Sequence, residues 1–90
     1  MKDLLFEWDE EKNKRNIKKH KISFETARFV FADENRIEFF QNRNGEERYL
    51  TIGRVGEIIV VVYTMRNEIH RIISARFAEY NEREAYFGNC

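Results

Sequence analysis

The chain has 90 residues and carries 16 Lys and Arg against 16 Asp and Glu, so its formal net charge is zero. A chain of this length buries only roughly 60–65% of its unfolded surface, which leaves apolar residues for one core and none for a second. No stretch approaches the roughly 18 apolar residues of a membrane helix, and the start lacks the apolar run of a signal peptide. We therefore expect one cytoplasmic domain over residues 1–90, with no membrane contact and no attraction to nucleic acid from net charge alone.

Metal and cofactor motifs are missing from the sequence. The single cysteine, Cys90, has no partner for a disulfide or a metal cluster. There is also no glycine-rich phosphate loop and no Ser-His-Asp or Cys-His arrangement. The sequence thus predicts neither metal nor cofactor, and any chemistry has to come from Arg, Lys, His and Tyr side chains.

Two helices are expected near the start of the chain. Asp9 is a plausible N-cap for a helix over residues 9–20, with acids in its first turn and bases in its last, which suits the helix dipole. Ser23 can cap a second helix that ends near Ala32 and carries an apolar stripe of Phe24, Ala27, Val30 and Phe31. Before them, residues 5–8 are expected to be extended, either against a sheet or as a staple for the first helix.

The rest of the chain has the pattern of strands joined by short turns. Residues 36–42 and 47–54 flank Asn44-Gly45, a pair that favours a tight hairpin. After a turn at Gly56, residues 58–64 are apolar on both faces, which predicts a central strand. A turn over residues 65–68 with Asn67 left-handed, a strand over 68–75 and a helix over 79–87 stopped by Gly88 complete the order.

These elements predict an α+β fold with two N-terminal helices, a four-stranded antiparallel meander and a C-terminal helix. The helices are expected to cover one face of the sheet, because the phenylalanine stripe must be buried. The other face stays partly free, and a site in so small a domain would fit there.

Four segments in order closely resemble the BrnT family of bacterial toxins. They are F-E-W-D-E-x-K-x-x-x-N-x-x-K-H-x-I-S-F-E-x-A (6–27), E-E-R-Y-L-x-I-G-R (46–54), V-V-V-Y-T (60–64) and R-I-I-S-A-R (71–76), followed by E-R-x-x-Y at 82–86. The resemblance implies a RelE-like ribonuclease fold and the toxin of a type II toxin-antitoxin pair. It also implies an RNA substrate, inhibition by a ribbon-helix-helix antitoxin similar to BrnA, and operator DNA binding only through that antitoxin.

RNA cleavage without a metal needs a base, an acid and cations that stabilise the charged phosphate. Histidine is the side chain best suited to proton transfer near neutral pH, and only His20 of the two histidines lies in a segment that resembles the family. Lys12, Asn16 and His20 are spaced i, i+4, i+8 on the first helix, with Lys19 beside them. The alternative is that His20 only makes a favourable contact with the helix dipole.

The arginine candidates are Arg48, Arg54, Arg71 and Arg76, because a planar guanidinium can hold two phosphate oxygens. Successive side chains of a strand point to opposite faces of the sheet. Arg48 and Arg54 are therefore expected on one face, roughly 20 Å apart, and Arg71 and Arg76 on opposite faces if their strand is regular. Arg48 and Arg76 rank first, because both are expected at strand ends. For each arginine the alternative is a strand-end charge paired with a nearby Glu.

Two functions remain open from the sequence. The first is an endoribonuclease that cleaves RNA without metal, with a positive patch on the open sheet face formed by Lys12, Lys19, His20, Arg48 and Arg76. Tyr86 could stack on a base or donate a proton there, although core packing is its alternative. The second, favoured by the neutral net charge, is a non-enzymatic protein-binding domain on the same fold.

Overall fold

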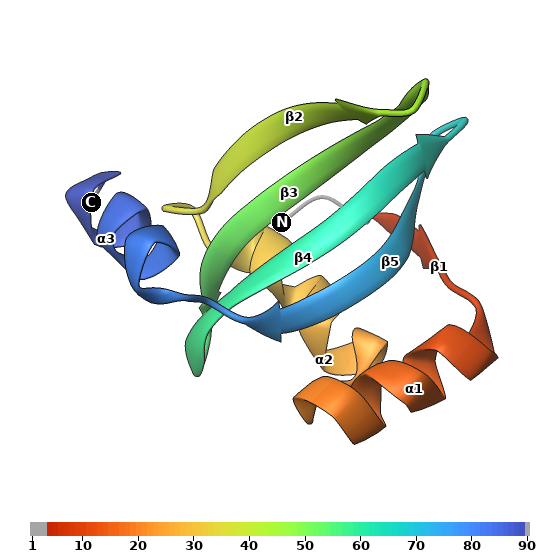
Figure 1. Ribbon diagram of the computed structural model, residues 1–90, viewed down its shortest axis with the longest axis horizontal. Helices are drawn as coiled ribbons and strands as arrows, with labels where there is room; N and C mark the ends of the chain where they lie inside the picture. Colours follow the sequence, from red (N-terminus) through yellow and green to blue (C-terminus); the bar gives the residue numbers. More distant parts are fainter. Residues whose placement is uncertain (1–3, 90) are drawn as a thin grey trace.

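The computed structural model describes residues 4–89, and its centre is a five-stranded sheet with the order β1-β5-β4-β3-β2 (Figure 1). Strands β2 to β5 form the antiparallel meander that the sequence predicted, and the extended N-terminal piece adds β1 parallel to β5. Cys90 lies outside the described residues. The elements are β1 (Leu5–Glu7), α1 (Glu10–His20), α2 (Phe24–Ala27), the 3-10 helix η1 (Arg28–Ala32), β2 (Ile37–Arg43), β3 (Glu46–Val55), β4 (Glu57–Arg66), β5 (Ile69–Phe77) and α3 (Tyr80–Asn89).

Helix α1 begins and ends where the sequence predicted. The Asp9 carboxylate accepts hydrogen bonds from the backbone amides of Glu11 and Lys12 at 2.8 and 3.2 Å, and these bonds lower the pKa of Asp9. The helix stops at Lys21, whose φ of 66° is left-handed. Asp9 is therefore confirmed as the N-cap, and the acidic first turn and basic last turn match the helix dipole.

The predicted second helix is split into two kinds of winding. Ser23 caps α2 as expected, accepting a bond from the Thr26 amide at 3.1 Å, but the α-helical part ends at Ala27 and a 3-10 helix continues to Ala32. The apolar stripe is nevertheless buried. After the tighter turn, the Asp33 carboxylate reaches β3 and accepts a bond from the Arg54 amide at 2.7 Å.

The turns between strands confirm the expected backbone conformations. Asn44 and Gly45 both have positive φ, 53° and 82°, and Gly56 and Asn67 are also left-handed. The strands are longer than expected, because β4 continues to Arg66 and β5 to Phe77. Arg76 therefore lies within its strand and not after it, and the turn before β5 is confined to two residues.

The sequence predicted that the helices cover one face of the sheet, but the structure places them on both faces. α1, α2 and η1 pack on one face, with Phe24, Val61 and Ile72 in the main core. α3 lies at the end of the sheet remote from the β2–β3 and β4–β5 turns (Figure 1), where Tyr86 packs with Ile52 and other residues of the opposite face. Because the central strands are apolar on both faces, this end needed a cover on the second face too.

Helix α3 also differs at both ends from the prediction. Gly88 does not stop it, since the helix includes Asn89. At its start there is no Ser or Thr cap, but the Glu82 carboxylate accepts a hydrogen bond from the Glu79 amide at 2.8 Å. This is one of the two bonds of a capping box, the one in which the carboxylate of the third helical residue accepts from the N-cap amide. The Glu79 amide is therefore paired, although Glu is a poor N-cap residue.

Candidate functional site

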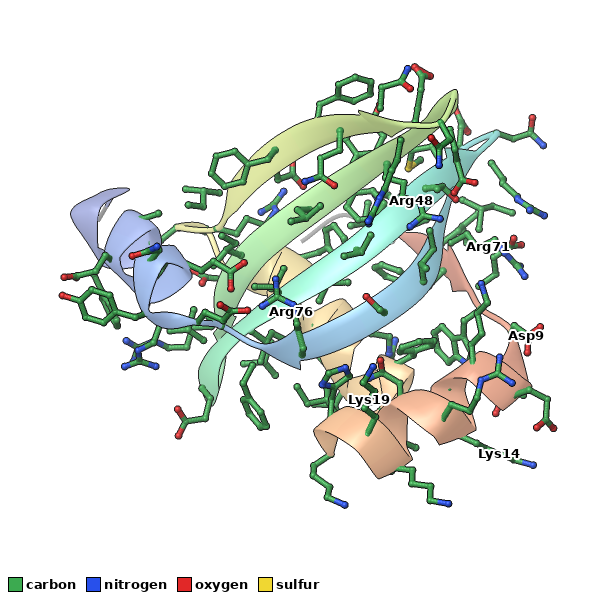
Figure 2. All side chains as sticks on the ribbon, in the orientation of Figure 1. Asp9, Lys14, Lys19, Arg48, Arg71 and Arg76 are labelled. Carbon is green, nitrogen blue, oxygen red and sulfur yellow. The ribbon has the colours of Figure 1, made fainter. Side chains whose placement is uncertain are left out.

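A shallow groove of about 390 Å³ lies between α1 and β5. Figure 2 shows Lys19 on the side of α1 that faces β5, whereas Lys14 points away from the sheet. No carboxylate of the described residues lines the groove, and its wall on α1 is mainly basic. Its lining residues are Lys12, Arg15, Asn16, Lys19, His20, Ile73 and Ser74.

Asn16 determines how α1 sits on the sheet. Its side-chain amide donates to the Ala75 carbonyl at 2.8 Å and to the Ile22 carbonyl at 2.9 Å, and its oxygen accepts from the Ala75 amide at 3.2 Å. The side chain thus pairs with backbone groups of β5 as a neighbouring strand would. With only 7% of its surface exposed, Asn16 holds the floor of the groove. Contact of Asn16 with substrate stays a prediction, and the structure adds a role in positioning α1.

The cations of the groove are not neutralised by the protein itself. No carboxylate among the described residues lies within 4.0 Å of the charged groups of Lys12, Arg15 or Lys19. Lys14, on the outer side of the same helix, is paired with Glu11 at 3.8 Å. The groove is therefore a site of concentrated positive charge in a chain whose net charge is zero.

A β-bulge in β5 changes which way its arginines point. Tyr63 pairs with Ile72 and Val62 with Ser74, which leaves Ile73 as the extra residue of the bulge. Arg71 and Arg76 consequently stand on the same face, opposite to the helix-covered core, and the expectation that they point to opposite faces is wrong. Ser74 lies between them on that face and also borders the groove.

Three of the four candidate arginines are occupied by carboxylates of the chain. Arg76 makes two bonds of 2.7 Å to Glu82, Arg71 is 2.9 Å from Glu7 and Arg48 is 2.8 Å from Glu46. The hydrogen bonds within the first pair raise the pKa of Arg76 and lower that of Glu82. The alternative left open for each arginine, a charge paired with a nearby Glu, is what the structure shows for these three.

The predicted five-residue patch is therefore only partly assembled. Lys12, Lys19 and His20 line one groove, and Arg76 lies on the adjoining open face, tied to α3. Arg48 follows the Asn44-Gly45 turn at the hairpin end of the sheet, and in Figure 2 it lies closer to Arg71 than to Arg76. It is not part of the groove.

Arg54 and Tyr86 lie at the α3 end of the molecule. The Arg54 guanidinium is 5.7 Å from the centre of the Phe87 ring, and Arg54 does not line the groove. Tyr86 is 3% exposed, and its hydroxyl donates to Asp33 at 2.6 Å. This burial agrees with core packing, the alternative given for Tyr86, because a ring packed in this way is not exposed for stacking on a base.

The two histidines have different surroundings. His70 packs among the rings of Phe6, Phe31 and Tyr63, with centroids 5.0 to 5.4 Å away, so it belongs to the aromatic core. His20 is partly exposed and lines the groove beside three cations. An imidazole next to unpaired ammonium and guanidinium groups can hold a phosphate and move a proton at it.

Three residues of the groove, Arg15, Ile73 and Ser74, were not predicted from the sequence. Arg15 is three residues after Lys12 and four before Lys19, so helical spacing alone could have placed it on the same side of α1. Ile73 and Ser74 carried no such signal, because their positions depend on the bulge.

Within residues 4–89 no cluster of three or more His, Cys, Asp or Glu side chains could hold a metal ion. None of the helices described is long and apolar enough to cross a bilayer.

Comparisons with known proteins agree with the fold. A family model described as the ribonuclease toxin BrnT of type II toxin-antitoxin systems matches residues 8–82. The crystal structure of the Brucella abortus ribonuclease toxin BrnT superposes with a TM-score of 0.62 at 26% sequence identity, over 84% of this chain and 97% of that one. No curated protein sequence matches the chain.

Proposed function

The chain belongs to the BrnT family of ribonuclease toxins of type II toxin-antitoxin systems, and from that premise we propose that it is an endoribonuclease that cleaves RNA without a metal ion in the groove between α1 and β5. One observation carries this proposal. The groove combines Lys12, Arg15 and Lys19, none of them paired with a carboxylate of the described residues, with one partly exposed histidine. No other described surface brings unpaired cations and an imidazole together.

The groove offers what cleavage next to a 2′-hydroxyl requires. A phosphate seated in it would lie between the charges of Lys12, Arg15 and Lys19, which would stabilise the additional negative charge of the transition state. His20 at the same wall can take a proton from the attacking hydroxyl or give one to the departing oxygen. Asn16 acts indirectly, because it fixes the helix that carries all four side chains.

The open sheet face would receive the RNA beyond the scissile phosphate. Ser74 borders both surfaces, and Arg71 and Arg76 flank it along β5. Since both guanidiniums are already bound to carboxylates, we assign them weaker contacts with the substrate than the groove cations. Arg48 and Arg54 are more distant still and would contact RNA only over several nucleotides.

Membership of the family implies a cognate antitoxin and an RNA substrate. We propose that the antitoxin is a ribbon-helix-helix protein similar to BrnA, that it blocks the groove, and that operator DNA is bound through the antitoxin in the cytoplasm. Tight sequence-specific DNA binding by this chain alone would contradict this part of the proposal.

A second candidate function rests on the paired arginines. If the open face serves only to dock another protein, Arg48, Arg71 and Arg76 would stay paired with their carboxylates and would bind no phosphate. The chain would then be a degenerate toxin or an adaptor. The groove argues against it, because His20 stands beside the unpaired cations and offers a proton transfer that protein docking does not require.

RNA cleavage by the purified chain separates the two candidates. Total RNA and a defined single-stranded RNA should be incubated with the protein, with and without EDTA and with and without ribosomes. Cleavage that persists in EDTA supports the proposal, and cleavage that EDTA abolishes contradicts its metal-free mechanism. If the chain cleaves nothing under any of these conditions, the protein-binding function becomes the better account.

A further inference from the structure

Helix α1 has a second hollow on its other flank, away from the groove. This cleft has a volume of about 330 Å³ and opens between the last turns of α1, the start of α2 and the ends of β3, β4 and β5. A helical turn of 3.6 residues places Ile17 on the side of α1 opposite to Lys12, Arg15 and Lys19, and Lys21 follows as the left-handed residue that ends the helix. The lining residues of the cleft are Ile17, Lys21, Ile22, Ser23, Thr26, Val55, Ile59 and Phe77.

The floor of this cleft is apolar and its mouth is open. Ile22 and Ile59 form buried walls at 5% and 2% exposure, while Ile17 and Phe77 at the mouth are 42% and 48% exposed. Serine and threonine in the lining are already bonded to each other, Ser23 donating to Thr26 at 3.0 Å. Apart from Lys21, the cleft therefore offers mainly apolar contact.

The rim of the cleft is positively charged. Lys21 lines it, and the Lys21 ammonium donates a hydrogen bond at 3.2 Å to the carbonyl of Lys18, which lies in the last turn of α1 beside the lining residues. No carboxylate of the described residues lies within 4.0 Å of either ammonium group, and none lines the cleft. An apolar floor with a cationic rim is complementary to an apolar side chain that has acidic neighbours.

We propose that this cleft anchors the antitoxin: one large apolar side chain of a short acidic segment inserts between Ile17 and Phe77, and acidic neighbours pair with Lys18 and Lys21. The identity of the partner rests on the proposed function. A segment held here that continues across α1 has to span only about 10–12 Å, the diameter of a helix, to cover the cationic groove on the other flank. Anchoring and inhibition are then carried by different residues of the toxin.

The apolar lining favours a protein over RNA as the occupant. Nucleic acid sites combine cations that contact phosphate with aromatic rings that stack on bases. In this cleft one ring, Phe77, stands among aliphatic walls, and no cation–π contact to it is found among the described residues. A buried apolar anchor surrounded by charged pairs is instead the usual composition of a protein-protein hot spot.

The test measures antitoxin binding and RNA cleavage in the same variants. The probe is the small protein encoded by the reading frame next to that of this chain, titrated into the full-length toxin by calorimetry. Ile17→Glu should weaken binding at least about thirtyfold, the loss typical of a hot-spot residue. Lys18→Glu with Lys21→Glu should weaken it tenfold or more, with a lower salt dependence than the parent.

The control is Phe39→Glu, which places the same charge at a phenylalanine that is 47% exposed on edge strand β2. It should change the affinity less than about threefold, as expected of a residue outside the hot spot. Ile17→Glu should keep the parent rate of RNA cleavage but resist inhibition by the antitoxin. Ile17→Ser, which adds no charge, gives a second measure of the anchor if the glutamate variant unfolds.

Several results would overturn the anchor. These are an Ile17→Glu affinity within threefold of the parent, a larger loss from Phe39→Glu, or no binding of the neighbouring protein by the parent itself. Impaired RNA cleavage with unchanged antitoxin binding would instead assign the cleft to a nucleobase. If the parent cleaves no RNA but Ile17→Glu still loses antitoxin binding, the ribonuclease proposal fails and the anchor stands.

Discussion

The side-chain amide of Asn16 pairs with both backbone groups of Ala75, donating to its carbonyl at 2.8 Å and accepting from its amide at 3.2 Å. One residue of α1 thereby completes the hydrogen bonding of β5 at this position. The same helix carries Lys12, Arg15, Lys19 and His20, so this pairing decides where the groove cations stand relative to the sheet.

Replacing Asn16 tests this dependence. Asn16→Ala leaves the Ala75 amide and the Ala75 and Ile22 carbonyls without their partner, and we expect it to lower the free energy of unfolding by about 2–4 kcal/mol. Urea denaturation measures the change. Asn81→Ala, at an exposed site in α3, is the control and should stay within about 0.5 kcal/mol of the parent. Equal effects at the two sites would show that the pairing contributes nothing.

The Arg76–Glu82 pair predicts a pH-dependent stability. Hydrogen bonds from Arg76 are the main reason that the pKa of Glu82 lies below its ordinary value of 4.5. The stability contributed by Glu82 is therefore full above pH 4.5 and is lost as the pH falls through the lowered pKa of the folded state. Glu82→Gln should cost about 1–2 kcal/mol at pH 7, since both side chains are partly exposed, and less at pH 3.

Glu84→Gln is the matched control for this prediction. Glu84 is exposed on the same helix and accepts a bond from the Tyr80 hydroxyl. Its replacement should change the unfolding free energy by less than about 0.5 kcal/mol at either pH. A pH-independent loss for Glu82→Gln would mean that the carboxylate charge is not what holds α3 to β5.

Gly53 should not tolerate even one methyl group. A Cβ at this position would lie 2.7 Å from Cγ2 of Val30 and 3.3 Å from the Asp33 carboxylate. We expect Gly53→Ala to cost about 1–3 kcal/mol, as overpacking of a core typically does. Gly88→Ala, where nothing lies within 4 Å, should instead stabilise α3 by up to about 1 kcal/mol. Thermal unfolding of both variants checks the prediction, and a neutral Gly53→Ala would contradict the close approach.

Local signals in the sequence were enough to predict most of the fold. Asp9 and Ser23 were correctly predicted as helix caps, and Asn44-Gly45 and Asn67 as left-handed turn residues, because each depends on the residue's own backbone preferences. The position of α3 could not be predicted in the same way. It depends on which face of the sheet still has uncovered apolar side chains, which is known only after the strands have paired.

The candidate site was predicted less well, for a similar reason. Helical spacing correctly brought Lys12 and Lys19 near His20. Whether Arg71 and Arg76 point to the same face of the sheet depends on the bulge at Ile73, and no residue type at that position indicates a bulge. The pairing of Arg76 with Glu82 joins residues six apart through the bend from strand to helix, so spacing alone could not distinguish a free cation from a neutralised one.

We propose above all that the unpaired cations of the groove stabilise the phosphate during RNA cleavage. The decisive comparison is between Lys19→Ala, Arg15→Ala and Lys14→Ala, three neutralisations on one helix, of which the third lies outside the groove and is paired with Glu11. All three variants should fold like the parent, because each of these side chains is exposed. His20→Ala belongs to the same series and distinguishes proton transfer from simple positioning.

The measurement is the single-turnover rate of RNA cleavage by each purified variant in the presence of EDTA. We predict that Lys19→Ala and Arg15→Ala each lose on the order of a hundredfold to a thousandfold, as expected when one preorganised donor is removed, while Lys14→Ala stays within about threefold of the parent. Equal losses in all three variants, or full activity of Lys19→Ala and Arg15→Ala, would contradict the assignment of catalysis to this groove.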